Sequence, residues 1–129
     1  MRIKLSSIFV DDQARAAEFY SEVLGFEIKH DIPLGGGLRW LTLIASGRDD
    51  LELVLEPNEN PAAETYQKAL FEQGIPITAF EVDDVDAQYS RLTEKGVSFK
   101  AEPANQGPVR IAVLSDGCGN WIQLYQPLG

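Results

Sequence analysis

The chain has 129 residues, a length typical of one compact domain, and its hydrophobic fraction of 44% is sufficient for a buried core. Its net charge is −9 and its basic residues are scattered, so nucleic acid is excluded as the expected partner, because nucleic-acid binding needs clustered Lys and Arg. No apolar run approaches the length of a membrane span, no signal peptide is apparent, and the single cysteine, Cys118, cannot form an internal disulfide. We therefore expect a cytoplasmic protein without a membrane partner.

The first half of the chain predicts one helix and four strands. Strand one is expected over residues 3–10, and Asp12 is a suitable N-cap for a helix over residues 13–24 that ends at Gly25. The rest of this half is expected to contain strands at 26–30, 38–45 and 51–56, separated by a loop at 33–37 and a turn at 46–50.

The second half repeats the first after a linking helix. Val82-Asp83-Asp84 repeats Val10-Asp11-Asp12 after 72 positions, and Asp84 is expected to cap a helix over 85–95. Asn60-Pro61 predicts the start of the linking helix. The strands of this half are expected at 77–82, 97–100, 109–114 and 120–126, with a hairpin turn at 116–120.

Each half therefore has the element order β-α-β-β-β, which predicts an α+β fold. We divide the chain into module one (1–57), the linking helix (58–75) and module two (76–129). Each sheet must bury one face against its helix, because an amphipathic sheet needs a covering layer. The other face of each sheet is then left to curve around something.

Strand alternation separates the two faces of each sheet. The expected core face carries Ile8, Val10, Leu51, Leu53, Leu55, Thr78, Phe80, Val82, Ile122 and Leu124. The opposite face mixes aromatic, small and carboxylate side chains, which suits a ligand cleft but equally suits a partly solvated sheet face. The candidate cleft residues are Leu5, Ser7, Phe9, Trp40, Glu52, Val54, Glu56, Ile77, Ala79, Glu81, Trp121, Gln123 and Tyr125.

Three groups on this face could carry chemistry, and each has a plainer interpretation. Glu52, the candidate catalytic residue, could act as a general base beside Glu56 and Glu81, or these carboxylates could bind a cation or remain in water. Cys118 could be a nucleophile, or a residue of a turn between glycines. The aromatic residues Phe9, Trp40, Trp121 and Tyr125 could stack on a planar or cationic ligand, or pack between modules.

The sequence resembles the glyoxalase/bleomycin-resistance/extradiol-dioxygenase superfamily, also called vicinal oxygen chelate proteins. The most specific segments are Val10-Asp11-Asp12, Phe19-Tyr20 with Leu24-Gly25-Phe26, and the stretch from Asp116 to Leu124. The resemblance implies two paired β-α-β-β-β modules that form a cupped, curved mixed sheet with a cleft, and it implies a homodimer. In the enzymes of the superfamily, a divalent metal lies in that cleft.

The resemblance also implies four metal-ligand positions, which fall on Leu5, Glu52, Ile77 and Gln123 of this chain. Leu5 and Ile77 have no donor atom, and zinc or iron sites need several His, Cys or carboxylate ligands. The single histidine, His30, is expected at the end of a strand, far from these positions. We therefore expect no metal and no cofactor.

Three functions remain open at this point. The first is a metal-free protein that binds a small molecule, such as an antibiotic or an aromatic or cationic metabolite. The second is a glyoxalase-type lyase, isomerase or dioxygenase with an atypical metal site or a carboxylate-based site. The third is a domain that only dimerises or docks to a protein.

Overall fold

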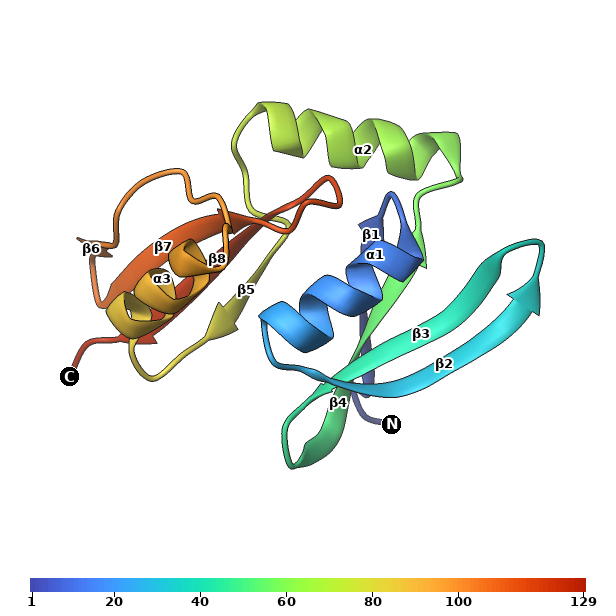
Figure 1. Cartoon of the computed structure of the whole chain (residues 1–129), viewed down its shortest axis with the longest axis horizontal. Coiled ribbons are helices and arrows are strands. Elements are labelled where there is room, and N and C mark those ends of the chain that lie inside the picture. Colours follow the sequence, from blue (N-terminus) through green and yellow to red (C-terminus); the bar gives the residue numbers. More distant parts are fainter. The chain divides into compact units, whose positions relative to one another are not determined.

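A computed structural model describes all 129 residues of the chain. The chain divides into two compact units, Met1–Tyr66 and Gln67–Gly129, each built on an open four-stranded mixed sheet (Figure 1). The three helices and two sheets confirm the predicted α+β class. None of the helices combines the length and the apolar character that crossing a membrane requires.

The first unit contains one sheet with the strand order β1-β4-β3-β2. β1 and β4 are parallel, and the other neighbouring strands are antiparallel. The helix α1 packs against β3 and β4 (Figure 1). The elements are β1 (Leu5–Val10), α1 (Gln13–Glu18), the π-helical turn η1 (Phe19–Val23), β2 (Glu27–Gly35), β3 (Leu38–Ala45) and β4 (Arg48–Pro57).

The second unit repeats this topology with the strand order β5-β8-β7-β6, and its parallel pair is β5 and β8. The helix α3 packs against β7 and β8. The linking helix α2 (Pro61–Glu72) spans the division between the two units. The elements of the second unit are β5 (Thr78–Glu81), α3 (Val85–Glu94), β6 (Ala104–Gln106), β7 (Val109–Ser115) and β8 (Trp121–Pro127).

Both predicted helix caps are confirmed. The carboxylate of Asp12 accepts a hydrogen bond from the backbone N–H of Arg15 at 3.0 Å, and Asp84 accepts one from Ala87 at the same distance. Each side chain thus satisfies an N–H group that has no partner within the helix. Gly25 and Gly96 follow the two helical segments with φ values of 92° and 87°, which favour glycine.

The face of each sheet that contacts its helix forms the core. In the first unit, Ile8, Val10 and Leu55 are at most 3% exposed and belong to the predicted core face. Leu51 was expected on the same face but is 55% exposed, so that part of the prediction is wrong. Alternation fixes the face of a side chain but not how far along the strand the helix extends. The second unit buries Val85, Leu92, Ala112, Leu114, Ile122 and Leu124.

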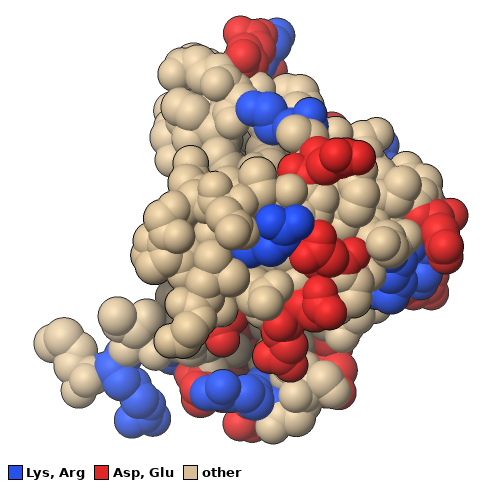
Figure 2. Space-filling view, turned by 90° about the vertical axis from the view of Figure 1, so that its left-hand side faces the viewer, with Lys and Arg blue, Asp and Glu red and all other residues tan.

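Two arginines take equivalent places in the repeated halves and form ion pairs. Arg39 lies 3.2 Å from Asp31, and Arg110 donates two hydrogen bonds to Asp86, at 2.8 and 2.9 Å. The hydrogen bonds from Arg110 hold the pKa of the Asp86 carboxyl below its usual value, and they raise the pKa of the guanidinium. On the face shown in Figure 2, basic side chains lie singly among acidic ones, as their scatter along the sequence predicts.

Several predicted boundaries are wrong. The helix expected over 13–24 changes at Phe19 into a π-helical turn, where the N–H of Leu24 donates to the carbonyl of Phe19. The strand expected at 26–30 begins at Glu27 and continues into the predicted loop 33–37 as far as Gly35, and β4 already begins within the predicted turn 46–50. Residues 97–100 make a single bridge at Phe99 instead of a strand, and the edge strand is β6, at 104–106.

Candidate functional site

The face of the first sheet opposite α1 brings six of the predicted cleft residues into register. β1 and β4 pair Leu5 with Glu52, Ser7 with Val54, and Phe9 with Glu56. Alternation places these residues opposite the buried core side chains of the same strands. β3 adds Thr42, which pairs with Val54, and Trp40, which lies two positions before it on the same face.

Glu52 lies at the centre of a polar cluster on this face. Its side chain is only 8% exposed, and its Oε1 accepts a hydrogen bond of 2.9 Å from the hydroxyl of Thr42. The Nζ of Lys4 lies 3.6 Å from Oε2, and Nε2 of His30 lies 3.8 Å from Oε1. A buried carboxylate needs such partners because losing its hydration is costly. Lys4, His30, Thr42 and Glu52 are called the Glu52 cluster below.

The prediction that His30 lies far from Glu52 is wrong. Because β2 extends to Gly35, His30 lies within the strand and pairs with Thr42. Irregularities between Pro33 and Gly35 and between Ile28 and His30 shift the register of this hairpin. A one-residue shift moves side chains to the other face of a sheet. A strand extended as far as Gly35, rather than ending at His30, would have suggested that His30 pairs with β3.

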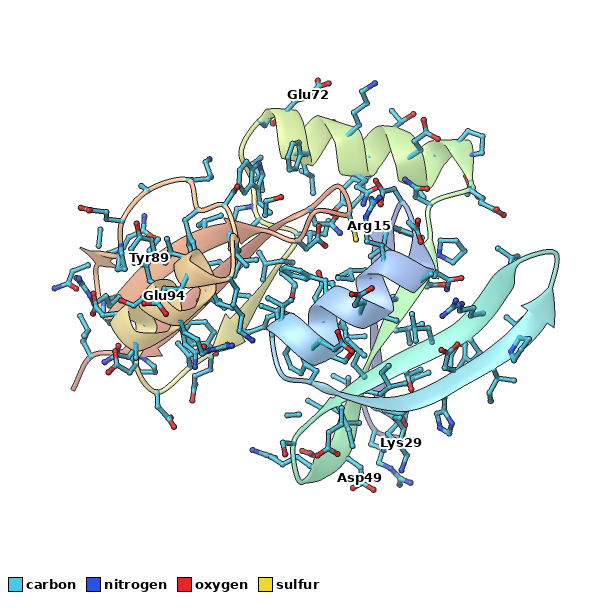
Figure 3. All side chains as sticks on the ribbon, viewed as in Figure 1. Arg15, Lys29, Asp49, Glu72, Tyr89 and Glu94 are labelled. Carbon is cyan, nitrogen blue, oxygen red and sulfur yellow. The ribbon has the colours of Figure 1, made fainter.

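Lysine side chains lie around the same end of the sheet. Lys4 also donates a hydrogen bond to the backbone carbonyl of Asp49, at the start of β4. Lys29 of β2 lies 3.8 Å from the carboxylate of Asp49, and Figure 3 shows these two residues side by side. The basic groups therefore offset acidic charge at this end, although the chain as a whole is strongly acidic.

A hollow of about 570 Å³ opens at the other end of β1 and β4, within the first unit. Phe9 and Glu56 line it from the strands, and Tyr66 lines it from α2. The volume lies within the range of small-molecule sites, and aromatic rings beside a few polar groups are typical of them. Phe9 and Glu56 were predicted cleft residues, whereas Tyr66 was missed. The remaining lining residues are Pro57, Asn60, Ala62 and Ala63.

In the second unit, the Trp121 side chain contacts Phe71 and Lys100. Its ring stacks on that of Phe71, with centroids 4.9 Å apart and planes 5° apart, and its Nε1 donates to the carbonyl of Phe71 at 3.0 Å. The Nζ of Lys100 lies 5.5 Å from the ring centroid. β5 and β8 pair Ala79 with Gln123 and Glu81 with Tyr125, and Ile77 directly precedes β5.

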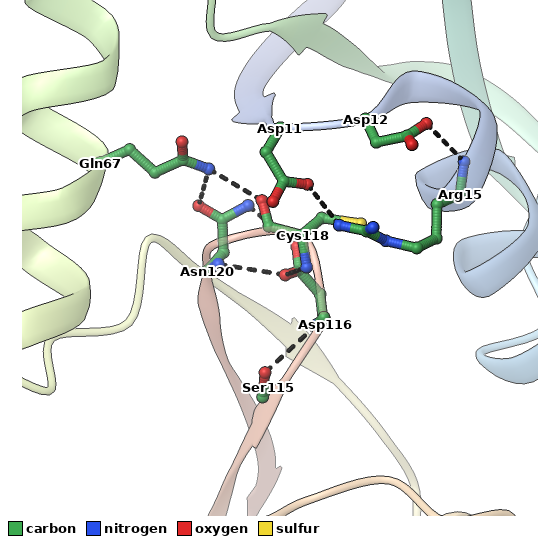
Figure 4. A network of polar contacts seen from close by, with 9 residues as sticks. Asp11, Asp12, Arg15, Gln67, Ser115, Asp116, Cys118 and Asn120 are labelled. Carbon is green, nitrogen blue, oxygen red and sulfur yellow. Dashed lines mark hydrogen bonds and ion pairs between the residues drawn. The ribbon is translucent and has the colours of Figure 1, made fainter.

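The turn between β7 and β8 contains a second buried polar network (Figure 4). Asp116 accepts hydrogen bonds from the backbone N–H groups of Cys118 and Asn120 at 2.7 and 3.1 Å, and one from the Asn120 side chain at 2.9 Å. Gln67 donates to the carbonyl of Cys118 and to the Asn120 side chain, both at 3.1 Å. Cys118 is fully buried in this turn, which favours the structural interpretation of this residue over the nucleophilic one.

The model of the Glyoxalase/Bleomycin resistance protein/Dioxygenase superfamily matches residues 2–124, nearly the whole chain. The chain belongs to this superfamily.

Relatives of this superfamily member resemble it over almost their full length. The uncharacterised protein YurT of Bacillus subtilis (strain 168) is 53% identical over 127 residues, which are 98% of this chain and 99% of YurT. The crystal structure of UcmS2 has a TM-score of 0.82 and 32% identity, with 97% of each chain covered. TnmS3, an antibiotic binding protein from Streptomyces sp. CB03234, has a TM-score of 0.76 and 35% identity over 98% of this chain and 96% of TnmS3.

The donor groups of the first unit do not fit the divalent metal of the superfamily's enzymes. Leu5 has no donor atom, and the Lys4 ammonium lies 3.6 Å from the Glu52 carboxylate, where it would repel a metal cation. No group of three or more His, Cys, Asp or Glu side chains is arranged to hold a metal ion. That the protein binds no metal remains a prediction. That residues of both units line one cleft also remains a prediction.

Proposed function

We propose that this superfamily member binds a small planar aromatic molecule, such as an antibiotic, on the face of the first sheet opposite α1. The observation that carries the proposal is the hollow beside Phe9, Glu56 and Tyr66. Tyr66 is 53% exposed, so its ring can be covered by a ligand. Burying that apolar surface would supply binding energy, and the nearby polar groups would orient the ligand.

The similarity to TnmS3 supports the choice of ligand. TnmS3 is an antibiotic binding protein, and its likeness covers nearly the whole of both chains. Fold alone does not determine function, so the proposal also needs a site that suits such a ligand. We further propose that the protein is a homodimer, and native mass spectrometry of the purified protein measures both the oligomer and any retained ligand.

Substituting Tyr66→Ala is expected to weaken binding of a planar aromatic ligand about tenfold, because a stacking surface is lost from the hollow. Isothermal titration calorimetry with quinolone, anthracycline and flavone compounds measures the effect. Thr65→Ala is the matched control, since Thr65 is an exposed neighbour on α2 that does not line the hollow. Micromolar binding that is equally strong in both variants would place the ligand elsewhere, and no binding to the wild type would refute the proposal for these classes.

The Glu52 cluster favours a second candidate function, an enzyme with a carboxylate-based site. A buried carboxylate beside a histidine is an arrangement that can transfer protons in a lyase or isomerase reaction. We regard binding as the better-supported function. The contacts of Glu52 with Lys4 and Thr42 also suit a carboxylate that holds a ligand without reacting with it.

Elemental analysis of the purified protein tests whether this second candidate function would depend on a metal. We expect less than stoichiometric zinc, iron, nickel and manganese, because the donor groups around Glu52 do not fit a divalent ion. One metal ion per chain that is lost in Glu52→Ala, but retained in Glu56→Ala, would contradict this prediction and favour the metal-dependent alternative.

A further inference from the structure

The carboxylate of Glu52 has unused capacity to accept hydrogen bonds. Its only side-chain hydrogen bond is the one from Thr42, at 2.9 Å. The nitrogen atoms of Lys4 and His30 lie 3.6 and 3.8 Å away, beyond hydrogen-bonding distance. A carboxylate has about four lone-pair sites, and no fully buried side-chain oxygen of the chain lacks a hydrogen-bond partner, so the unpaired Oε2 of Glu52 is accessible from outside. A donor on a bound ligand would therefore be favourable here.

The charges around Glu52 indicate which donor fits. A cationic group at Glu52 would come close to the Lys4 ammonium, which already offsets the charge of the carboxylate. Glu56 lies on the same strand face, but no lysine or arginine offsets its charge. Its side chain forms no ion pair or hydrogen bond in the structure. A basic group on a ligand is thus better placed beside Glu56, and a neutral donor is better placed beside Glu52.

A hydroxyl group matches both side chains that border this position. It can donate to the Glu52 carboxylate and accept from His30 when Nε2 carries the hydrogen, so it uses both groups at once. The His30 side chain is 41% exposed, which leaves it accessible to a ligand. Building on the proposed function, we propose that Glu52 and His30 form a subsite for a neutral phenolic or alcoholic hydroxyl group of the aromatic ligand.

The distance between this subsite and the hollow sets the size of the ligand. Leu5–Glu52 and Phe9–Glu56 are register pairs four residues apart on the same parallel strands. At about 3.3 Å per residue, their separation is about 13 Å. Ser7, which pairs with the buried Val54, lies between them and is exposed, so a ligand can contact the sheet along this path. A ligand of about three rings, with a hydroxyl group at one end, would span both places.

The test compares a hydroxylated probe with its methyl ether. Isothermal titration calorimetry of the full chain with 4′-hydroxyflavone and 4′-methoxyflavone is expected to show about tenfold weaker binding of the ether. Methylation removes the donor and leaves the Glu52 carboxylate without its ligand partner, and a site built for a hydroxyl group rejects such an analogue.

Two variants and a matched control assign the preference to the subsite. Glu52→Gln is expected to reduce the ratio of the two affinities to about threefold or less, because a neutral amide is a weaker acceptor than a carboxylate. His30→Phe is likewise expected to reduce this ratio, because it removes the other group of the subsite. The His30 side chain is 41% exposed, so this variant is expected to fold even if Glu52→Gln does not. Glu22→Gln removes the same charge at an exposed position of η1 outside the proposed site, and it is expected to leave the ratio unchanged.

The outcomes separate this proposal from the proposed function. Equal affinity of the wild type for the two flavones overturns the hydroxyl subsite while the proposed function stands. An unchanged ratio in both Glu52→Gln and His30→Phe likewise overturns it. If neither flavone binds the wild type but other planar aromatic compounds do, the three-ring hydroxyl ligand is refuted. If no planar aromatic compound binds, the proposed function and the subsite fall together.

Discussion

Replacing Leu55 by alanine is expected to lower the free energy of unfolding by about 2–5 kcal/mol. Leu55 is fully buried on the face of β4 that contacts α1, so the substitution removes apolar contacts and leaves a cavity. Neighbouring side chains are held by close packing and can fill the cavity only in part. Urea denaturation followed by circular dichroism measures the loss as a lower midpoint with an unchanged slope.

Leu51→Ala on the same strand is the matched control. Alternation places Leu51 on the same face as Leu55, yet its side chain is 55% exposed. The same substitution is therefore expected to cost less than about 1 kcal/mol, since exposed positions without special contacts contribute little. Equal losses in the two variants would show that the core extends to the start of β4, contrary to the structure.

This pair of leucines shows what a sequence pattern can determine. The period of two separates the faces of β4 correctly, because it follows from strand geometry alone. The helical coverage of those faces depends on how α1 lies across the sheet, which involves residues far away in sequence. Leu55 is buried and Leu51 is exposed for that reason, although both are leucines at equivalent phases of the alternation.

The local features of the repeat were the most predictable ones. Asp12 and Asp84 cap their helices as expected, because capping needs only a side chain and the backbone a few residues ahead. The strand at 38–45 was also correctly bounded by the glycines before it and the turn after it. Such features are encoded over a few residues, and both halves of the chain carry them.

The Glu52 cluster was only partly predictable. Glu52 was singled out from its strand, but its partners Lys4, His30 and Thr42 come from three other segments. Their approach depends on the irregular register of β2 against β3, and β-bulges have weak sequence signals. Tyr66 was missed for a similar reason, since the place of α2 beside β1 is a tertiary feature.

The buried network in the second unit leads to the other large effect. Asp116→Ala is expected to lower the free energy of unfolding by about 2–4 kcal/mol. The substitution removes the acceptor of the N–H groups of Cys118 and Asn120, and also that of the Asn120 side chain. Asp116 is 1% exposed, so water replaces these hydrogen bonds poorly.

Ser115→Ala is the control for Asp116→Ala, because Ser115 is the last residue of β7, directly before Asp116. Its hydroxyl accepts one exposed hydrogen bond, from the N–H of Gly117 at 3.2 Å. We expect this variant to lose less than about 1 kcal/mol, since water can take the place of an exposed acceptor. Chemical denaturation measures both losses, and hydrogen exchange locates them. Loss of amide protection at Cys118 and Asn120 in Asp116→Ala alone would identify the carboxylate as the group that holds this turn. Similar losses in both variants would mean that the turn depends on its backbone conformation instead.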